Sequence, residues 1–249
     1  MFRFHLEECG MKPPQYENPR YRAALAEQQR LGAVRRDAPL PQALRLVAGA
    51  DCSFNRFGSA FWGALVVCDL EDTFRVVDSA VVRMEVDFPY IPGLLGFREV
   101  PVLCAAYDRL GVRPEVTLVD AQGTAHPRRF GSASHLGVEL DIPTVGCAKS
   151  LLCGTFVEPG EGRGCWSPLV DVEEPIGAVL RTRTGVAPVF VSPGHLSDLP
   201  SSMDLVLRCA PRYRIPEPIR MAHELVNEAR RADGGGGGVM GKSGDQVIH

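Results

Sequence analysis

The order of the apolar segments constrains the fold of this chain more than any other feature of the sequence. Three β-rich runs come first, over residues 45–54, 61–70 and 73–84, and only short connections separate them. A helical pattern then runs from about Leu94 to Leu110, and strand-like and helical segments alternate after it. A meander followed by such an alternation favours a mixed β-sheet with helices on its faces. We therefore predict an α/β fold.

The rest of the chain extends this pattern within a single domain, and the order of the elements fits a ribonuclease H-like core. Pro101 interrupts the helical pattern around it, so we expect a kink or a short break there. The other predicted elements are a helix over 20–37, a strand within 114–123, a turn and helix over 126–140, a strand ending near Lys149, a hairpin over 177–195 that turns at Thr184-Gly185, and helices over 200–214 and 217–231.

The two ends of the chain differ in composition from the middle. We predict an N-terminal extension over 1–19, a folded domain over 20–231 and a flexible glycine-rich tail over 232–249. In that tail, Gly236 to Ser243 match the phosphate-binding pattern G-x-x-x-x-G-K-[ST]. A working loop of this kind follows a buried strand and opens a helix, whereas here a charged helix precedes it and only six residues follow Ser243. We interpret the match as coincidental and expect no nucleotide cofactor.

Composition argues against several classes of protein. The 249 residues contain no run of about 18 apolar residues, and the charged N-terminus lacks the apolar segment of a signal peptide. The eight cysteines form no C-x-x-C pair and most lie in apolar runs, so we expect reduced thiols rather than disulfides or a zinc site. These features predict a cytoplasmic protein that does not associate with membranes, and we expect it to be a monomer.

The charge balance leaves nucleic-acid binding open. A net charge of −3 argues against binding through bulk positive charge. A local basic patch would suffice, however, and residues 208–231 hold six arginines against three glutamates. The solvated surface of a helix explains the same residues equally well.

Acidic residues follow two of the predicted strands. Asp51 follows one apolar run, and Asp120 closes another at residues 116–119. If the two strands are neighbours, both carboxylates emerge at one edge of the sheet, and Glu99 on the intervening helix would add a third. Carboxylate oxygens suit Mg²⁺, which needs only one or two of them in addition to substrate phosphate. Each acid taken alone is explained as the cap of a turn, so spacing makes the metal site a hypothesis only.

Residues 89–92, PYIP, place two prolines around an aromatic and a branched apolar residue. Proline restricts the backbone, and proteins that part the steps of a base stack use stiff apolar wedges of this kind. A rigid surface turn that packs on the core is the alternative explanation.

Five segments resemble the endonuclease V family: FPYIPGLLGFRE, LVDAQGTAHPRRFGSASHLG, IPTVGCAKSLLCG, FVSPGH and YRIPEPIRMAH. They occur in the family's order, and the resemblance extends from about Leu25 to Ala229. It implies a ribonuclease H-like catalytic domain and a DNA repair endonuclease that uses Mg²⁺, with Mn²⁺ as a substitute. Such an enzyme recognises deoxyinosine, the deamination product of deoxyadenosine, and hydrolyses the second phosphodiester bond on its 3′ side.

The resemblance also implies roles for individual residues. Three carboxylates would hold the metal: Asp51, Glu99 and Asp120. His223 would lie near the metal and the attacking water, and Lys149 would stabilise the scissile phosphate. The strand-separating wedge would consist of Pro89, Tyr90, Ile91 and Pro92. The base pocket would consist of Gly93, Leu95, Gly123, His126, Gly131, Gly146 and Leu152.

The sequence departs from the family at one position of this pocket. The family usually has D-G-x-G where this chain has Asp120-Ala121-Gln122-Gly123. If Ala121 must adopt a positive φ, the cost is about 1–2 kcal/mol. Three outcomes are open for the methyl group of Ala121: it narrows the pocket, it shifts the enzyme's preference for the base, or the pocket tolerates it. Two further histidines in matched segments, His135 and His195, are expected to be structural.

Two alternative functions stay open at this point. An inosine-specific endoribonuclease would carry the same motifs, because a contact to a 2′-hydroxyl cannot be assigned from sequence. A nucleic-acid-binding module without catalytic activity belongs to a different class, and the joint presence of the three carboxylates and Lys149 argues against it. The expected substrate is DNA containing deoxyinosine, with inosine-containing RNA as the alternative.

Overall fold

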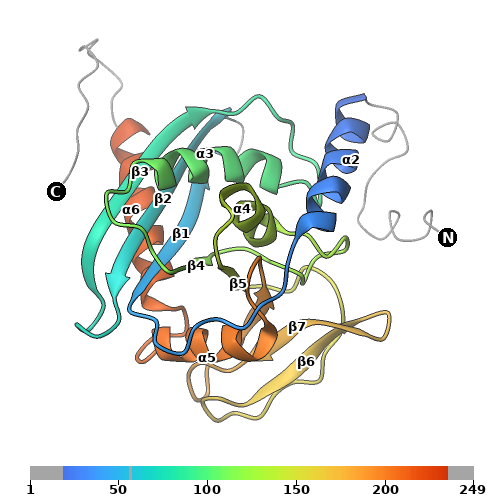
Figure 1. The fold of residues 1–249 in the computed structure, drawn as a ribbon, viewed down its shortest axis with the longest axis vertical. Helices are drawn as coiled ribbons and strands as arrows, with labels where there is room; N and C mark the ends of the chain where they lie inside the picture. Colours follow the sequence, from blue (N-terminus) through green and yellow to red (C-terminus); the bar gives the residue numbers. More distant parts are fainter. Residues whose placement is uncertain (1–18, 56–57, 235–249) are drawn as a thin grey trace.

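One eight-stranded sheet forms the centre of the molecule (Figure 1). The structure is a computed structural model that describes residues 19–55 and 58–234. The strands are β1 (Leu46–Phe54), β2 (Ala60–Asp69), β3 (Arg75–Glu85), β4 (Val116–Val119), β5 (Thr144–Ala148), β6 (Trp166–Asp171), β7 (Glu174–Leu180) and β8 (Val189–Pro193). Their spatial order is β3-β2-β1-β4-β5-β8-β7-β6. The helices are α2 (Pro19–Val34), α3 (Gly96–Asp108), α4 (Ser132–Leu140), α5 (Leu199–Cys209) and α6 (Glu217–Gly234).

The sheet is mixed, as predicted. The meander β1-β2-β3 is antiparallel, whereas β1, β4 and β5 are parallel neighbours. β5, β8, β7 and β6 then pair in antiparallel fashion. Parallel strands need a crossover connection, and α3 and α4 provide the two crossovers that lead into β4 and β5. The parallel centre of the sheet therefore follows from the alternation of helices and strands in the sequence.

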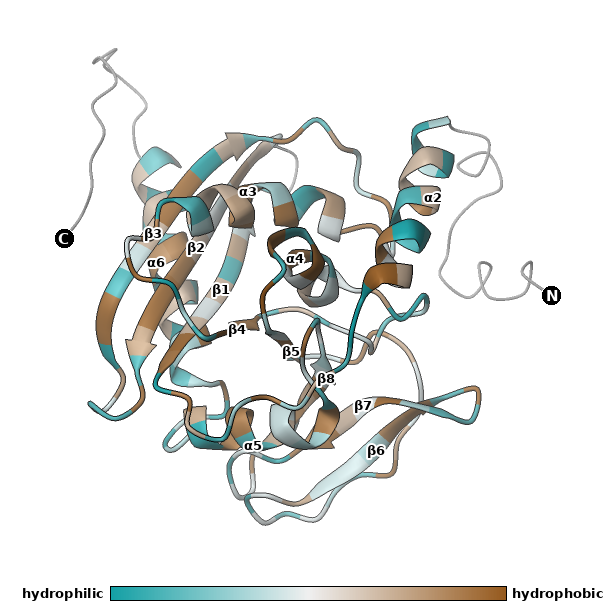
Figure 2. Ribbon diagram, in the orientation of Figure 1, coloured by the Kyte–Doolittle hydropathy of each residue, from teal (hydrophilic) through white to brown (hydrophobic). Residues whose placement is uncertain are grey.

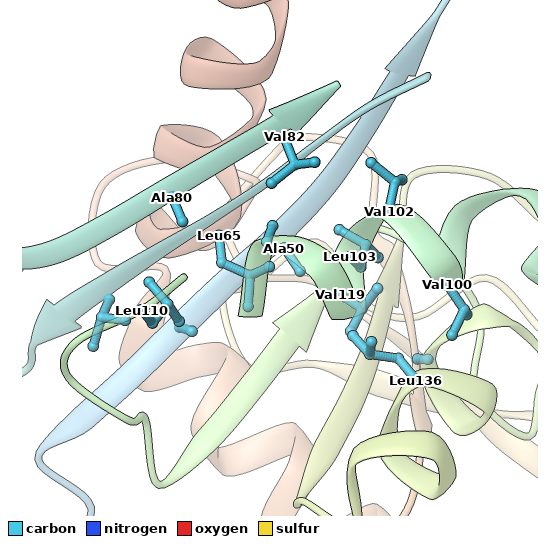
Figure 3. Packing of buried hydrophobic residues seen from close by; sticks show 14 of the residues in the cluster. Ala50, Leu65, Ala80, Val82, Val100, Val102, Leu103, Leu110, Val119 and Leu136 are labelled. Atoms are coloured by element: carbon cyan, nitrogen blue, oxygen red, sulfur yellow. The ribbon is translucent and has the colours of Figure 1, made fainter. Parts of the chain in front are cut away.

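Helices cover both faces of the sheet, and strand β2 shows how the sequence achieves this. Its alternate residues Phe61 and Leu65 pack in the cluster that α3 and α4 complete, part of which Figure 3 shows. On the opposite face, Ala64 packs with Val226 of α6. The strand is consequently apolar along almost its whole length, and it is mostly brown in Figure 2. Each large apolar side chain buried in this way contributes about 1.5–3 kcal/mol, so the position of α3, which carries Glu99, is well fixed.

Helix α6 begins in direct contact with strand β1. A Cβ atom on Gly49 would lie 2.0 Å from the backbone of Pro218, a distance that no side chain tolerates. Glycine at this position of β1 therefore permits the backbone of α6 to approach the sheet. This close approach determines the distance between β1 and the next turn of α6, which carries His223.

Several boundaries differ from the sequence-based expectation. Helix α3 continues through Pro101 without interruption, so the expected break is absent. The helix predicted over 200–214 ends at Cys209. Strand β6 was not predicted at all. The N-terminal extension and the glycine-rich tail, including the phosphate-loop match at 236–243, lie almost entirely outside the described residues, so the predicted domain limits stay predictions.

The cysteines and the helices of the described residues bear on two predictions made from composition. The seven cysteines among them are all free thiols. None of the described helices is long and apolar enough to cross a lipid bilayer.

Candidate active site

Two aspartates lie next to each other on neighbouring strands in the middle of the sheet. β1 and β4 run parallel, with Ala50 opposite Val119. The backbone N–H of Asp120, the residue after β4, donates a hydrogen bond to the carbonyl of Ala50 at 3.0 Å. Asp51 follows Ala50 directly. The two strands are therefore neighbours, as the hypothesis of a shared metal site for Asp51 and Asp120 requires.

His223 on α6 completes a cluster of potential metal ligands. One ligand atom from each of Asp51, Asp120 and His223 lies within 4.8 Å of the other two. Nδ1 of His223 lies 2.6 Å from Oδ2 of Asp51, and about half of the imidazole side chain is exposed (51%). Lys149, the residue after β5, forms an ion pair with Asp120. Two carboxylates, an imidazole and an ammonium group therefore meet at one point.

The third predicted carboxylate, Glu99, lies near this cluster and is held by α4. Ser132, the first residue of α4, donates a hydrogen bond from Oγ to Oε2 of Glu99 at 2.8 Å. Burial raises the pKa of Glu99 to about 7, and the charges of Asp51 and Asp120 add to that effect. Burial, followed by the charge of Asp120, raises the pKa of Asp51 to about 6. The ionised forms of Glu99 and Asp51 are therefore destabilised in the folded protein.

The chemistry of this donor set fits a divalent metal ion. Carboxylate oxygens are the ligands that hard divalent cations prefer, and the cluster brings two of them together with a third nearby. Burial and like charge destabilise the ionised carboxylates. A cation bound among them removes that penalty, which Lys149, paired with Asp120, and His223, hydrogen-bonded to Asp51, offset only in part, since the pKa of Asp51 stays raised.

A cavity of about 380 Å³ opens beside the acidic residues. Glu99, Asp120 and Lys149 border it. Three of the four predicted wedge residues border it too: Tyr90, Ile91 and Pro92. So do five of the seven predicted base-pocket residues: Gly93, Leu95, His126, Gly131 and Leu152. The structure thus brings two of the three predicted metal ligands and most of the predicted wedge and pocket residues to one cavity, whereas Asp51 and Pro89 are not among the residues that border it.

Gly123 and Gly146 are not among the residues that border this cavity. A Cβ atom on Gly123 would lie 2.0 Å from the carbonyl oxygen of Pro193. A Cβ atom on Gly146 would lie 2.5 Å from the backbone nitrogen of Gly123. Both glycines therefore allow backbone segments to pass in close contact, which explains their identity without contact to a base.

The PYIP segment is exposed at its tip and anchored behind it. The side chain of Tyr90 is 64% exposed, whereas that of Ile91 is only 7% exposed. Ile91 packs with Leu94 and with Tyr21 and Ala24 of α2. The segment is therefore a turn packed on the core, and it also presents an aromatic ring to solvent, as a wedge requires; the role of a wedge stays a prediction.

Ala121 carries no backbone strain. Its φ is not positive, so the penalty considered for this departure from the family does not arise. Ala121 borders the cavity, and the methyl group is accommodated there.

Three residues of the site were missed by sequence reasoning. Ser132 holds Glu99, as described above. Asn227 lies one helical turn after His223 and donates from Nδ2 to its carbonyl at 2.8 Å, while Oδ1 accepts from Ser53 at 3.0 Å. Gln28 on α2 borders the cavity. Asn227 could have been predicted from sequence, because a residue four positions after His223 lies on the same face of a helix. No spacing or motif in the sequence indicates Gln28.

We expect His126 and His135 to stay neutral in the folded protein down to about pH 5. Burial and the nearby Arg128 charge lower the pKa of His126 to about 3, and burial lowers that of His135 to about 4. Unfolded histidine titrates near pH 6.5, so the stability linked to these groups is full above that pH and is lost as the pH falls below it. Imidazole NMR spectra recorded between pH 8 and 5 should show no protonation of either ring. A midpoint between pH 6 and 7 for either one would contradict the burial described here.

His195 has a structural environment. Its side chain is 2% exposed. Nδ1 accepts a hydrogen bond from the backbone N–H of Arg36 at 3.1 Å, and Nε2 lies 3.2 Å from Oδ1 of Asp141. These contacts join the segment after α2 to the end of α4, away from the acidic cluster, in line with the role expected from sequence.

Comparisons with known proteins agree with this arrangement. The family model described as Endonuclease V matches residues 28–224. Endonuclease V of Myxococcus xanthus is 52% identical over 188 residues, which cover 76% of this chain and 80% of the relative. The crystal structure of Endonuclease V from Streptomyces avermitilis has a TM-score of 0.82 at 40% identity and covers 86% of this chain and 94% of its own. Ciona intestinalis Endonuclease V, solved with a 24mer DNA containing an inosine followed by a ribo-adenosine, shares the fold at 23% identity, a TM-score of 0.70 and coverage of 87% and 100%.

Proposed function

This chain belongs to the endonuclease V family, the deoxyinosine-specific DNA repair endonucleases, and from that premise we propose that its acidic cluster binds Mg²⁺ and that the enzyme hydrolyses the second phosphodiester bond 3′ to deoxyinosine. The observation that carries the proposal is the meeting of Asp51, Asp120 and His223 beside the cavity that Glu99 and Lys149 border. The sequence-based identification of the family and of a phosphodiester hydrolase is confirmed.

Asp51 and Asp120 would hold the metal ion, with Glu99 as the third carboxylate. Mg²⁺ keeps several waters and binds through one or two carboxylates together with phosphate oxygens, so a cluster of this size suits it, and Mn²⁺ would substitute. When bound, such an ion neutralises charge on the transferring phosphate and lowers the pKa of water.

His223 would accept a proton from the attacking water. The hydrogen bond between its Nδ1 and Oδ2 of Asp51 places the imidazole proton on Nδ1 whenever Asp51 is ionised. Nε2 then carries the lone pair; Nδ2 of Asn227 lies 3.2 Å from it, and the half-exposed ring would also allow a water molecule to reach it. The carbonyl contact from Asn227 limits how far this turn of α6 can shift. Asp51 therefore sets the tautomer as well as binding the metal.

Lys149 would contact the scissile phosphate. Its ammonium group pairs with Asp120 and borders the cavity. An ammonium group is a point charge with three donors, which suits a phosphate oxygen. The salt bridge keeps the group beside the site where the phosphate must lie, and a metal ion on Asp120 would free it for that contact.

The cavity would receive the base after the wedge has displaced it from the stack. Enzymes that act at a base in duplex DNA commonly turn it out of the helix into a pocket. Tyr90 is exposed at the rim, and the pocket behind it is bordered by Gly93, Leu95 and His126. The crystal structure of the Ciona relative with inosine-containing DNA supports the choice of this substrate.

A cleavage assay on paired substrates tests the proposal. Oligonucleotides of one sequence, as DNA with a single deoxyinosine and as RNA with a single inosine, are incubated with Mg²⁺ or with excess chelator. The deoxyinosine strand of DNA should be nicked with Mg²⁺ and stay intact with chelator. Cleavage of the RNA while the DNA stays intact would replace the proposal with the endoribonuclease alternative. No cleavage of either would refute both.

A further inference from the structure

The backbone carbonyl of Gly93, directly after the PYIP segment, accepts hydrogen bonds from three side chains. Gln28 Nε2 lies 3.0 Å from this oxygen and His126 Nε2 lies 3.1 Å from it. Arg128 also donates to it from its guanidinium group. Gly93 has a φ of +75°, a conformation that favours glycine. The end of the wedge is thus fixed at one atom by residues from two other parts of the chain.

Gln28 connects this atom to the loop that borders the pocket. Its Nε2 also donates to the carbonyl of Phe130 at 3.0 Å, and its Oε1 accepts from Nε of Arg128. Both ends of the amide are therefore bonded, although the residue is only 5% exposed. A buried amide without such partners would be costly, so the position is built for these contacts.

Gln28 lies on the buried face of α2, the face that packs against the wedge. The buried residues of α2 are Tyr21, Ala24, Gln28 and Leu31, a spacing that places them along one side of a helix. Tyr21 and Ala24 pack on Ile91 of the wedge. An apolar residue would serve at Gln28 if packing were all that this position required. The hydrogen bonds of a glutamine also fix the orientation of the wedge relative to α2, which apolar contacts alone do not.

His126 has a defined role in the same network. The backbone N–H of Arg128 donates to Nδ1 of His126 at 3.1 Å, so the ring proton lies on Nε2 and is donated to Gly93. Burial keeps the imidazole neutral by lowering its pKa to about 3. His126 therefore contacts the wedge through Nε2, and neither ring nitrogen is left for the base.

We propose that Gln28 is a positioning residue that holds the wedge in a fixed orientation relative to the base pocket, so that a base displaced by the wedge enters the pocket. The inference rests on the proposed function, in particular on strand separation by PYIP. It predicts that Gln28 matters for DNA in which bases must be parted. It should matter little where the strands are already apart.

The test compares three substrates that carry the same deoxyinosine strand: a fully paired duplex, a duplex in which the bases around the lesion are unpaired, and the single strand. Gln28→Met keeps the length of the side chain and removes the hydrogen bonds. Gln29→Met is the matched control, because Gln29 is the next residue of α2 and is exposed. The measured quantity is kcat/KM on each substrate, with thermal melts of every variant.

Gln28→Met should lose about tenfold or more in kcat/KM on the paired duplex, and clearly less on the unpaired duplex and the single strand. Gln29→Met should match the unchanged enzyme on all three. Gln28→Glu, which keeps the acceptor for Arg128 and loses both donors, should repeat the loss on the paired duplex and decides the matter if Gln28→Met does not fold. Equal losses on all three substrates, or no loss on the paired duplex, would overturn the inference. Failure of the unchanged enzyme on every substrate would instead refute the proposed function.

Discussion

Replacing Asp120 with alanine should lower the rate of deoxyinosine nicking by at least about a thousandfold in saturating Mg²⁺, because the change removes a metal ligand and the partner of Lys149 together. Binding of the same DNA should persist, since the wedge and most of the cavity border do not depend on this carboxylate. Single-turnover cleavage and a gel-shift titration in Ca²⁺ measure the two properties separately. Asp51→Ala should behave in the same way.

Asp204→Asn provides the matched control, because this aspartate is exposed on α5 and lies in a helix that does not contribute to the site. It should cleave and bind as the unchanged enzyme does. An Asp120→Ala protein that keeps its nicking activity would refute the assignment of the metal site. Loss of DNA binding along with cleavage would show that Asp120 acts on the fold of the cavity instead.

Replacing Glu99 with glutamine should stabilise the metal-free protein at pH 8 while it removes activity. The pKa of Glu99 rises from an ordinary 4.5 to about 7 in the folded protein, so the folded state binds a proton that the unfolded chain releases between these values. Stability is therefore lost as the pH rises from about 4.5 to 7, and the full cost, up to about 3 kcal/mol, is present at pH 8. Glutamine has no charge to bury and can still accept the hydrogen bond from Ser132.

Urea unfolding in excess chelator at pH 8 and at pH 4.5 measures this difference. Glu99→Gln should be the more stable protein at pH 8, and the two should converge toward pH 4.5. Added Mg²⁺ should raise the stability of the unchanged protein more than that of the variant, because binding to the folded state alone stabilises it. Glu228→Gln, a change at an exposed position of α6, is the control and should have little effect. A less stable Glu99→Gln protein at pH 8 would contradict the burial of an unfavourable charge.

The sequence predicted the parts of the fold that depend on local pattern. The apolar runs that became β1 and β4 were identified, whereas their pairing was only a condition of the metal-site hypothesis, which the structure meets with a parallel pair. That pairing is what places Asp51 beside Asp120, so the centre of the candidate site was within reach of sequence reasoning. The roles of Lys149 and His223 came only from the resemblance to a family, because neither has a distinctive spacing.

The errors at element boundaries have identifiable causes. Strand β6 contains Pro168, and proline in a strand argues for an edge position or against a strand; β6 is indeed an edge strand of the sheet. Helix α5 ends at Cys209 because Ala210 precedes Pro211, and a residue before proline disfavours the helical conformation. The proline thus explains the helix end that the sequence-based prediction missed at α5, and it marks β6, which was not predicted, as an edge strand.

The contacts that hold the site in place were beyond prediction because they join distant segments. Gln28 meets Gly93 and Phe130 only after α2 has folded over the wedge. Ser132 meets Glu99 through the packing of α4 against α3. No periodicity or spacing in the sequence encodes such pairs.

The position of the cut in a labelled duplex decides whether the protein hydrolyses DNA 3′ to deoxyinosine with Mg²⁺. A duplex with one deoxyinosine, labelled at the 5′ end of that strand, is incubated with enzyme and Mg²⁺ and resolved to single nucleotides beside a duplex with deoxyadenosine at the same position. We expect one product, ending at the second phosphodiester bond 3′ to the lesion, that requires Mg²⁺ and is absent from the deoxyadenosine duplex. Equal cutting of the two duplexes, or the same product in excess chelator, would contradict it.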